Sequence, residues 1–437
     1  MTPFQKVLQK IREQASDSTE LGNAFEKLTK IYLENDAIQT QEYSKVWHYR
    51  DWAKENTNYS STDIGIDLVA KLRDEDGYCA IQCKFYQSDH SISKSDLDSF
   101  ISASSTPDFN RLVLIDTSTL AIGKNAQSVF DNLSQKYIRI QITELEESQI
   151  DWASYLKDET VQDRKKNKPR DHQLEAIEAI KEGLKEDDRG KMIMACGTGK
   201  TFTSLKIAEE LAGNGKTVLY MVPSLALMSQ TIREWKKDSA LEFTAFSACS
   251  DKKVGKKIAS KDEIEISLND LAFPATTDAE KLAEQIKRAD KTKMTVVFST
   301  YHSIDVISKS QYNHDLSEFD LIICDEAHRT TGATLSGDDE SNFVKIHSNE
   351  NIQGKKRLYM TATPRIFGET AKKQAEVGEV ALASMDDVNT YGKTLFYKGF
   401  GWAVENNLLT DYKVVVLMMD ERQVSDRVQK QFSDGAE

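Results

Sequence analysis

Five consecutive residues carry the groups that bind a triphosphate: Gly197, Thr198, Gly199, Lys200 and Thr201. The two glycines allow backbone N–H groups to turn inward around phosphates, and the lysine ammonium can reach the outer phosphates. The threonine hydroxyl can ligate Mg²⁺. The strict form of this phosphate-binding loop motif has a glycine six residues before its lysine, and this chain has Met194 at that position. We therefore predict a triphosphate site here, with a loop of merely similar sequence as the alternative.

An acidic pair, Asp325 and Glu326, follows the apolar run of residues 319–324. Parallel sheets place their ligands at the carboxyl ends of strands, so Asp325 can hold Mg²⁺ through water. Glu326 can polarise the water that attacks the γ-phosphate, and His328 is placed to sense the nucleotide. An ordinary helix N-cap is the alternative interpretation of the pair. Gln173, at the start of a predicted helix before the glycine-rich loop, can bind the adenine edge through its amide.

A second group of polar residues lies in the first hundred residues. Asp67 belongs to one predicted strand, and Gln82 and Lys84 lie two apart in the next strand and share a face. Phosphodiester hydrolysis needs a hard divalent cation held by oxygens, and a base or cation that orients the attacking water. Asp67 and Gln82 can hold Mg²⁺, and Lys84 can orient the water. Glu26 can add a carboxylate from a helix, although a solvent-facing polar row is the alternative.

The N-terminal set must be positioned by a mixture of helices and strands. Apolar periodicity predicts helices at residues 4–14 and 17–34, and a third at residues 125–133. Alternating and apolar runs predict the following strands, of which the first two form a hairpin around a turn at residues 74–77: residues 64–70, 78–85, 111–116 and 137–142. We expect a mixed-sheet domain at residues 1–160, followed by a basic, proline-broken linker at residues 161–172.

The triphosphate set must be positioned by a parallel sheet. Near-continuous apolar runs are typical of strands that are buried on both faces, and here they alternate with helical patterns. Such runs occur at residues 192–194, 217–223, 294–298, 319–324 and 357–361. The fold class is therefore α/β, with a parallel-sheet domain at residues 173–390. A lysine- and acid-rich stretch at residues 251–293 is interpreted as a peripheral insertion.

The N-terminal hairpin, with Gly65-Ile-Asp67 and Gln82-Cys-Lys84, resembles the Mrr-type branch of the PD-(D/E)xK nucleases. The resemblance implies a restriction-endonuclease-like fold, with Asp67 and Gln82 as metal-site residues and Lys84 as a catalytic residue. It also implies that Glu26 is a helix-borne auxiliary. Glutamine is a weaker metal ligand than a carboxylate, so a degenerate nuclease is an open alternative.

Six segments in the second domain occur in the order found in the first, RecA-like motor domain of superfamily 2 helicases and translocases of the DEAH type. The segments are Gln173, the glycine-rich loop, residues 223–224, 299–301, 325–328 and 361–363. The resemblance implies that ATP and Mg²⁺ are the ligands and accommodates Met194. It assigns contacts with the DNA backbone to Pro223, Ser224, Thr300 and Tyr301. It also assigns Thr361 and Thr363 to the coupling of hydrolysis with domain movement.

A nuclease joined to such a motor resembles the N-terminal part of Type ISP single-polypeptide restriction–modification enzymes. Local segments at residues 274–278, 299–303 and 325–332 are similar to that group. The resemblance implies cleavage of double-stranded DNA after ATP-driven movement along it. Residues 391–437 resemble the entry to a second motor domain, so we expect a fragment whose second motor, methyltransferase and target-recognition domains lie beyond it. A nuclease–helicase of another defence or repair system without methylation is the alternative.

The composition excludes several classes of protein. The net charge of −13 argues against indiscriminate binding of nucleic acid, although a local basic groove is compatible with it. Neither a membrane span nor a secretory leader is expected from the sequence. The five cysteines lie mostly in apolar runs and have no metal-ligand spacing, which is typical of reduced core residues. We expect a cytoplasmic protein without membrane contact.

Overall fold

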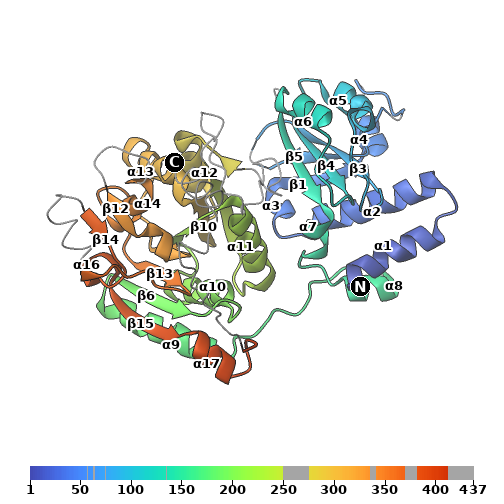
Figure 1. Cartoon of the computed structure of the whole chain (residues 1–437). Coiled ribbons are helices and arrows are strands. Elements are labelled where there is room, and N and C mark those ends of the chain that lie inside the picture. The colour runs from blue at the N-terminus through green and yellow to red at the C-terminus, as the bar shows by residue number, and fades with distance from the viewer. Residues whose placement is uncertain are drawn as a thin grey trace, which may run out of the picture.

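Two units, each built around its own sheet, lie side by side in the computed structural model (Figure 1). The structure describes residues 1–411, apart from residues 57, 63, 74, 134, 250–274, 335–340 and 370–380. Within the segment that resembles the entry to a second motor domain, residues 412–437 lie outside the described part. Among those described, none forms a helix with the length and apolar character that a membrane span requires.

The N-terminal unit contains a mixed sheet with the strand order β1-β2-β3-β4-β5. The first three strands are antiparallel to one another, and β3, β4 and β5 are parallel. The strands are β1 (Tyr43–His48), β2 (Leu68–Leu72), β3 (Tyr78–Lys84), β4 (Phe109–Asp116) and β5 (Lys136–Gln141). The predicted hairpin is therefore present, although its first strand begins at Leu68, because the residues before it form no continuous ladder.

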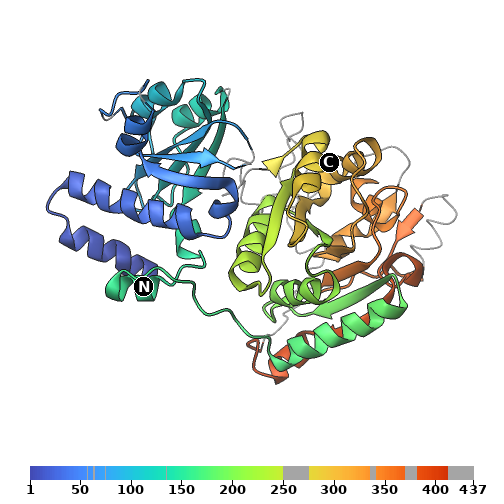
Figure 2. The same cartoon turned by 180° about the vertical axis from the view of Figure 1, so that it is seen from behind.

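Helices cover both faces of this sheet. On one face α2 (Ser18–Asn35), capped by Asp17, buries Phe25 and Leu28 against alternate residues of β3, including Ile81. Figure 2 shows α1 (Pro3–Gln14) beside α2. The other helices of the unit are α3 (Gln39–Glu42), α4 (Tyr49–Glu55), α5 (Asp98–Ser104), α6 (Lys124–Asp131), α7 (Ile142–Glu146) and α8 (Trp152–Asp158).

The second unit contains an eight-stranded sheet in which every pair of neighbours is parallel, in the order β15-β6-β13-β11-β7-β10-β8-β9. Its strands are β6 (Arg189–Met194), β7 (Thr217–Val222), β8 (Phe243–Ala248), β9 (Ala275–Thr276), β10 (Met294–Thr300), β11 (Leu321–Cys324), β13 (Arg357–Thr361) and β15 (Lys393–Lys398). A separate small ladder pairs β12 (Gly332–Thr334) with β14 (Ala381–Ala383). The expected α/β class, with a mixed sheet followed by a parallel sheet, is confirmed.

Helices lie on both faces of the parallel sheet, as its apolar strands require. One face carries α9 (Asp171–Glu186), α10 (Lys200–Leu211) and α11 (Leu225–Asp238). The opposite face carries α12 (Ala279–Arg288) and α13 (Ile304–Asn313). Shorter helices are α14 (Ser341–Val344), α16 (Val388–Tyr391) and α17 (Phe400–Glu405).

Two expectations about the limits of this unit need correction. The sheet continues past residue 390, where we expected the first motor domain to end, because β15 pairs with β6 through residues such as Lys393 and Gly190. The stretch expected to be a peripheral insertion contributes to the fold at its C-terminal end. There β9 joins the sheet edge and α12 buries Leu282 and Ile286 in the core, whereas residues 250–274 lie outside the described part.

Candidate nucleotide and nuclease sites

The glycine-rich loop connects β6 to α10, which begins at Lys200. Gly197 and Gly199 have φ angles of +77° and +89°, in the left-handed region that residues with a Cβ avoid. The Lys200 side chain is 10% exposed, and its Nζ lies 3.9 Å from Glu326 Oε1 and 3.9 Å from Cys196 Sγ. The loop therefore has the shape of a phosphate cradle, with its lysine directed toward the end of β11.

Two side chains at the start of α9 hold this loop from behind. Gln173 Nε2 donates to the Thr198 carbonyl at 3.1 Å, and His172 Nε2 lies 3.0 Å from the same oxygen. Gln173 Oε1 accepts from the Arg170 N–H at 2.9 Å. The contact of Gln173 with an adenine edge stays a prediction, and the structure adds that both ends of its amide bind the protein backbone. His172 was not predicted, since a single histidine has no characteristic spacing.

The acidic pair lies directly after β11, beside the glycine-rich loop. Asp325 is 6% exposed, and burial raises the pKa of its carboxyl to about 6. Its two carboxylate oxygens accept from the Glu326 N–H at 2.9 Å and from the Tyr220 hydroxyl at 3.4 Å. Glu326 has a φ of +46°, and a strained backbone of this kind in a non-glycine residue is typical of functional sites.

A relay of polar groups extends from Glu326 to β13. His328 Nδ1 lies 3.3 Å from Glu326 Oε2 and 3.0 Å from Thr361 Oγ1. Thr361 Oγ1 also accepts from the Thr363 N–H at 3.1 Å. The hydrogen bond from His328 lowers the pKa of Glu326, and Lys200 lowers it further, so this carboxylate is ionised at neutral pH. The structure thus brings the nucleotide residues Lys200, Glu326 and His328 together with Thr361, which was predicted to couple hydrolysis to domain movement.

The residues expected to contact DNA are mostly buried. The Tyr301 side chain is fully buried, and its hydroxyl donates to the Asp325 carbonyl at 2.7 Å. Thr300 is 5% exposed and its hydroxyl pairs with Ser303 at 2.8 Å, while Pro223 is also buried. Ser224 is partly exposed and caps α11 by accepting from the Leu227 N–H. The contacts of these four residues with the DNA backbone stay a prediction, and Ser224 is the one of the four that is partly exposed.

Asp67, Gln82 and Lys84 gather at one end of the mixed sheet. The pairing of Leu68 with Ile81 places Asp67 opposite Gln82, and Asp67 Oδ2 accepts from the Cys83 N–H at 2.6 Å. Gln82 is 3% exposed, and its Nε2 donates to the Gly65 carbonyl at 3.2 Å. Its Oε1 is buried and has no hydrogen-bond partner among the described residues. A buried amide oxygen without a donor, next to a carboxylate, suits a hard oxygen-seeking cation such as Mg²⁺.

Glu26 approaches this group from α2, on the opposite face of β3. Burial raises the pKa of the Cys83 thiol, and the charges of Asp67 and Glu26 raise it further, so both carboxylates lie near that thiol. Glu26 Oε2 itself lies 3.8 Å from His48 Nδ1. Glu26 is therefore a neighbour of the site, and the contact that the structure shows for its carboxylate is with His48.

The comparisons with known proteins divide the chain in the same way as the two sheets. Residues 34–162 match a restriction endonuclease family of the Mrr catalytic type, and residues 166–366 match the family of the Type III restriction enzyme res subunit. The chain therefore contains a restriction-endonuclease domain and a helicase-like domain.

Similar proteins include a probable helicase of African swine fever virus, 31% identical over 212 residues, which are 48% of this chain and 21% of that protein. An endonuclease subunit of the Type I restriction enzyme EcoAI of Escherichia coli is 26% identical over 58% of this chain and 24% of its own length. The solved structure of the ATP-dependent Type ISP restriction–modification enzyme LlaBIII bound to DNA is 38% identical. It covers 100% of this chain with a TM-score of 0.75, and this chain covers 27% of it. The chain thus spans about a quarter of the length of these proteins.

Proposed function

We propose that this chain is a DNA-cleaving and ATP-driven part of a Type ISP restriction–modification enzyme. Its fold matches that of such an enzyme over all of its residues, and it contains the two matched domains. One observation carries the proposal. A single chain holds a hairpin site with an orphaned amide oxygen beside a carboxylate, and a separate lysine–glutamate–histidine cluster at a phosphate cradle. Double-stranded DNA is the proposed substrate, because the LlaBIII structure is a DNA complex.

In the N-terminal unit, Asp67 and Gln82 Oε1 would hold Mg²⁺. A bound Mg²⁺ supplies Lewis-acid stabilisation of a phosphodiester and lowers the pKa of an attacking water. Lys84 follows Gln82 on the same face of β3, so its ammonium can orient that water and stabilise charge that develops on the phosphate. The Glu26 carboxylate near Cys83 adds negative charge behind the site.

In the second unit, the loop amides and Lys200 would bind the phosphates of ATP, and Thr201 and Asp325 would hold the accompanying Mg²⁺. Glu326 is ionised and lies 3.9 Å from Lys200, so it can accept a proton from the water that attacks the γ-phosphate. His328 holds Glu326 in position and links it to Thr361. Hydrolysis can thereby be sensed at the end of β13, from which the chain continues through Thr363.

A pair of variants in the full-length protein tests the assignment of two separate activities. Asp67→Ala is expected to abolish cleavage of plasmid DNA with Mg²⁺ and ATP while DNA-stimulated ATP hydrolysis continues. Lys200→Ala is expected to abolish ATP binding, because the phosphates lose their direct counter-charge. Matched controls are Asp158→Ala on α8 and Lys185→Ala on α9, which are exposed.

The outcomes discriminate between the proposed function and the alternatives. Retained plasmid cleavage by Asp67→Ala would contradict the nuclease assignment. A scaffold with a degenerate nuclease is the second candidate, because the amide of Gln82 is a weaker metal ligand than a carboxylate. That candidate predicts ATP hydrolysis by the unaltered protein without DNA cleavage in either Mg²⁺ or Mn²⁺.

A further inference from the structure

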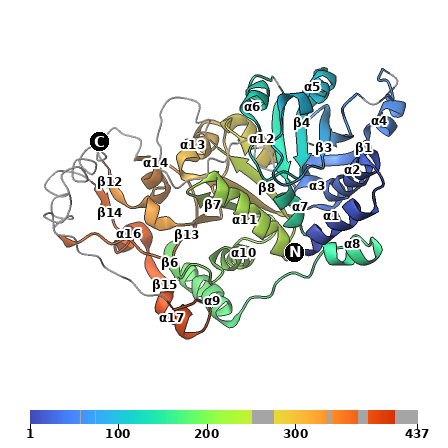
Figure 3. The ribbon, with the colours of Figure 1, turned by 45° about the vertical axis from the view of Figure 1, so that its right-hand side comes forward.

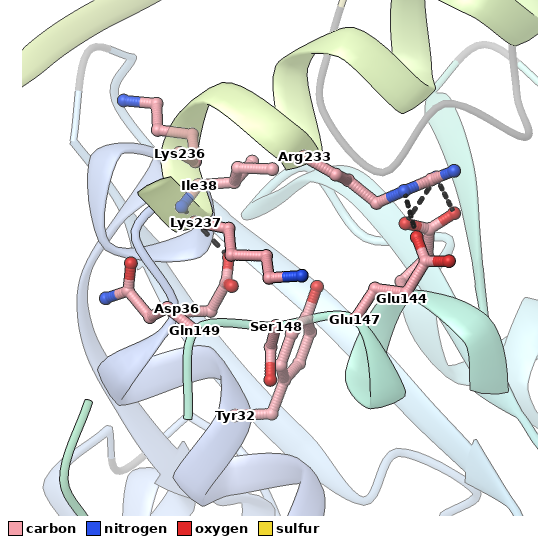
Figure 4. A pocket seen from close by; sticks show the side chains of 10 residues that line it. All are labelled: Tyr32, Asp36, Ile38, Glu144, Glu147, Ser148, Gln149, Arg233, Lys236 and Lys237. Atoms are coloured by element: carbon pink, nitrogen blue, oxygen red, sulfur yellow. Dashed lines mark hydrogen bonds and ion pairs between the residues drawn. The ribbon is translucent and has the colours of Figure 1, made fainter. Parts of the chain in front are cut away.

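Helix α11 lies on the side of the motor unit that faces the nuclease unit (Figures 1 and 3). From it, Arg233 reaches across to α7 of the nuclease unit. Arg233 Nη1 lies 2.7 and 2.8 Å from the two carboxylate oxygens of Glu144, as Figure 4 shows. Its Nε lies 2.8 Å from Glu147 Oε2, in an ion pair without hydrogen-bond alignment. The side chains of Arg233 and Glu144 are only 19% and 11% exposed, so this is an enclosed charge contact.

The opposite face of α11 contacts Thr201, the last residue of the glycine-rich motif. Trp235 is fully buried, and its Nε1 donates to the carbonyl of Thr201 at 3.2 Å. Its ring packs edge-on against Tyr220, whose hydroxyl donates to Asp325. Residues two apart on a helix point about 200° apart, so Arg233 and Trp235 face different units. Helix α11 is therefore a rigid spacer between the proposed Mg²⁺-binding groups and the nuclease.

Two further polar contacts join the units. The Gln41 amide pairs with the edge of β8, because its Nε2 donates to the Phe243 carbonyl at 2.9 Å and its Oε1 accepts from the Ala245 N–H at 3.1 Å. Lys281 of α12 pairs with Glu75 of the β2–β3 turn at 2.8 Å. Arg233 and Glu144 are enclosed where the two units meet, so loss of either partner leaves an uncompensated charge there.

The linker supports the same arrangement. Asn167 donates from its backbone N–H and from its Nδ2 to the two carboxylate oxygens of Asp238, at 2.9 and 3.0 Å. Asp238 is the last residue of α11, so the chain that joins the two units is fastened to the helix that separates them.

We propose that α11 couples the two activities, and that Arg233 is the positioning residue that fixes the nuclease unit relative to the nucleotide site. A change at the glycine-rich loop moves α11 through the contact between Trp235 and Thr201. The pairs that Arg233 forms with Glu144 and Glu147 pass this movement to the nuclease unit. The inference rests on the proposed function, because it assigns a connection between the two proposed activities.

A charge-swap experiment in the full-length protein tests this coupling. Arg233→Glu is expected to slow ATP-dependent DNA cleavage by roughly tenfold or more while ATP hydrolysis stays within about twofold of the unaltered rate. Combining it with Glu144→Arg re-forms an opposite-charge pair with reversed orientation and is expected to recover most of the cleavage. Arg288→Glu on α12 is the matched control, because its side chain is 76% exposed and its ion pair among the described residues is with Glu284 of the same helix.

Hydrogen exchange of α7 and α11, with and without a non-hydrolysable ATP analogue, is the second readout. We expect the analogue to change protection of α7 in the unaltered protein and in the charge-swapped pair, but not in Arg233→Glu. Equal losses of cleavage and ATP hydrolysis, or no recovery in the charge-swapped pair, would overturn the inference. Absence of cleavage in the unaltered protein would instead contradict the proposed function, and the exchange measurement would still decide whether α7 responds to the nucleotide.

Discussion

Replacing Gly199 by alanine tests the geometry of the phosphate cradle most directly. At its φ of +89° an added Cβ would lie 2.3 Å from Gln173 Nε2, so the alanine is strained and also collides with the amide that holds Thr198. Gly197→Ala provides an internal comparison. That residue has a similar φ of +77°, but the nearest described atom to an added Cβ there is the flexible end of Leu409, at 3.2 Å.

The expected loss of ATP affinity can be worked out from these contacts. A left-handed conformation costs a residue with a Cβ about 1–2 kcal/mol, and this cost applies to both variants. Displacing the Gln173 amide costs Gly199→Ala about 1 kcal/mol more, the typical net value of one hydrogen bond. ATP binds only the native shape of the loop, so the cost of restoring that shape appears as lost affinity. We expect affinity to fall by roughly 30- to 160-fold in Gly199→Ala and by about 5- to 30-fold in Gly197→Ala.

Titration calorimetry with ATP and Mg²⁺ measures both affinities, and thermal unfolding shows whether each variant is folded. Gly22→Ala in α2 is the control, because an added Cβ there meets no atom within 4 Å and should leave affinity unchanged. Equal ATP affinities of Gly199→Ala and Gly197→Ala would refute the assignment of Gln173 as the residue that supports this loop.

Three further predictions address the hydrolytic site and the motor core. Glu326→Gln should keep its affinity for ATP and lose about 10²- to 10⁴-fold in turnover, measured as phosphate release; unchanged turnover would exclude it as the base. Burial lowers the pKa of His347 from 6.5 to about 4, so the unfolded chain takes up a proton first and stability falls as the pH drops through this range. Urea unfolding at several pH values should show a loss of about 3 kcal/mol that is absent in His347→Gln; identical pH profiles would contradict it. The fully buried Arg357 donates to three carbonyls and to Asn349. Arg357→Lys should therefore lower the free energy of unfolding by about 3 kcal/mol, measured with a denaturant. An unchanged midpoint would show that a lysine satisfies these acceptors.

Local sequence patterns predict those parts of the fold and of the sites that depend on residues close together in the chain. The strand–loop–helix around Lys200 follows from glycine conformation and apolar periodicity, and both are local. The alternation of side chains along β3 is enough to place Gln82 and Lys84 on one face. The proximity of Asp325 and Glu326 to Lys200 also follows, because parallel strands present their carboxyl ends at one edge.

Local sequence patterns do not predict which distant strands pair or which polar side chains are buried. The strand β15 has polar residues at both ends, and it becomes a strand because it pairs with β6, which lies about two hundred residues earlier in the chain. Tyr301 belongs to a motif associated with DNA contact, yet whether a tyrosine hydroxyl faces solvent or a carbonyl depends on the strands around it. Gln173 illustrates the same point, since its amide could serve equally well for a base or for the loop.

The spacing of strand partners along the chain also sets an order of assembly during synthesis. All five strands of the nuclease sheet fall between residues 43 and 141, so all of them have been synthesised before β6, which begins at Arg189. The strand β6, by contrast, has β13 and β15 as its neighbours in the sheet, and the latter ends at Lys398. Domains fold as units from the N-terminus while the ribosome adds about 5–20 residues per second. A growing polypeptide of this protein therefore presents a finished nuclease fold for ten seconds or more, by the same rough estimate, before its phosphate-binding strand has both partners.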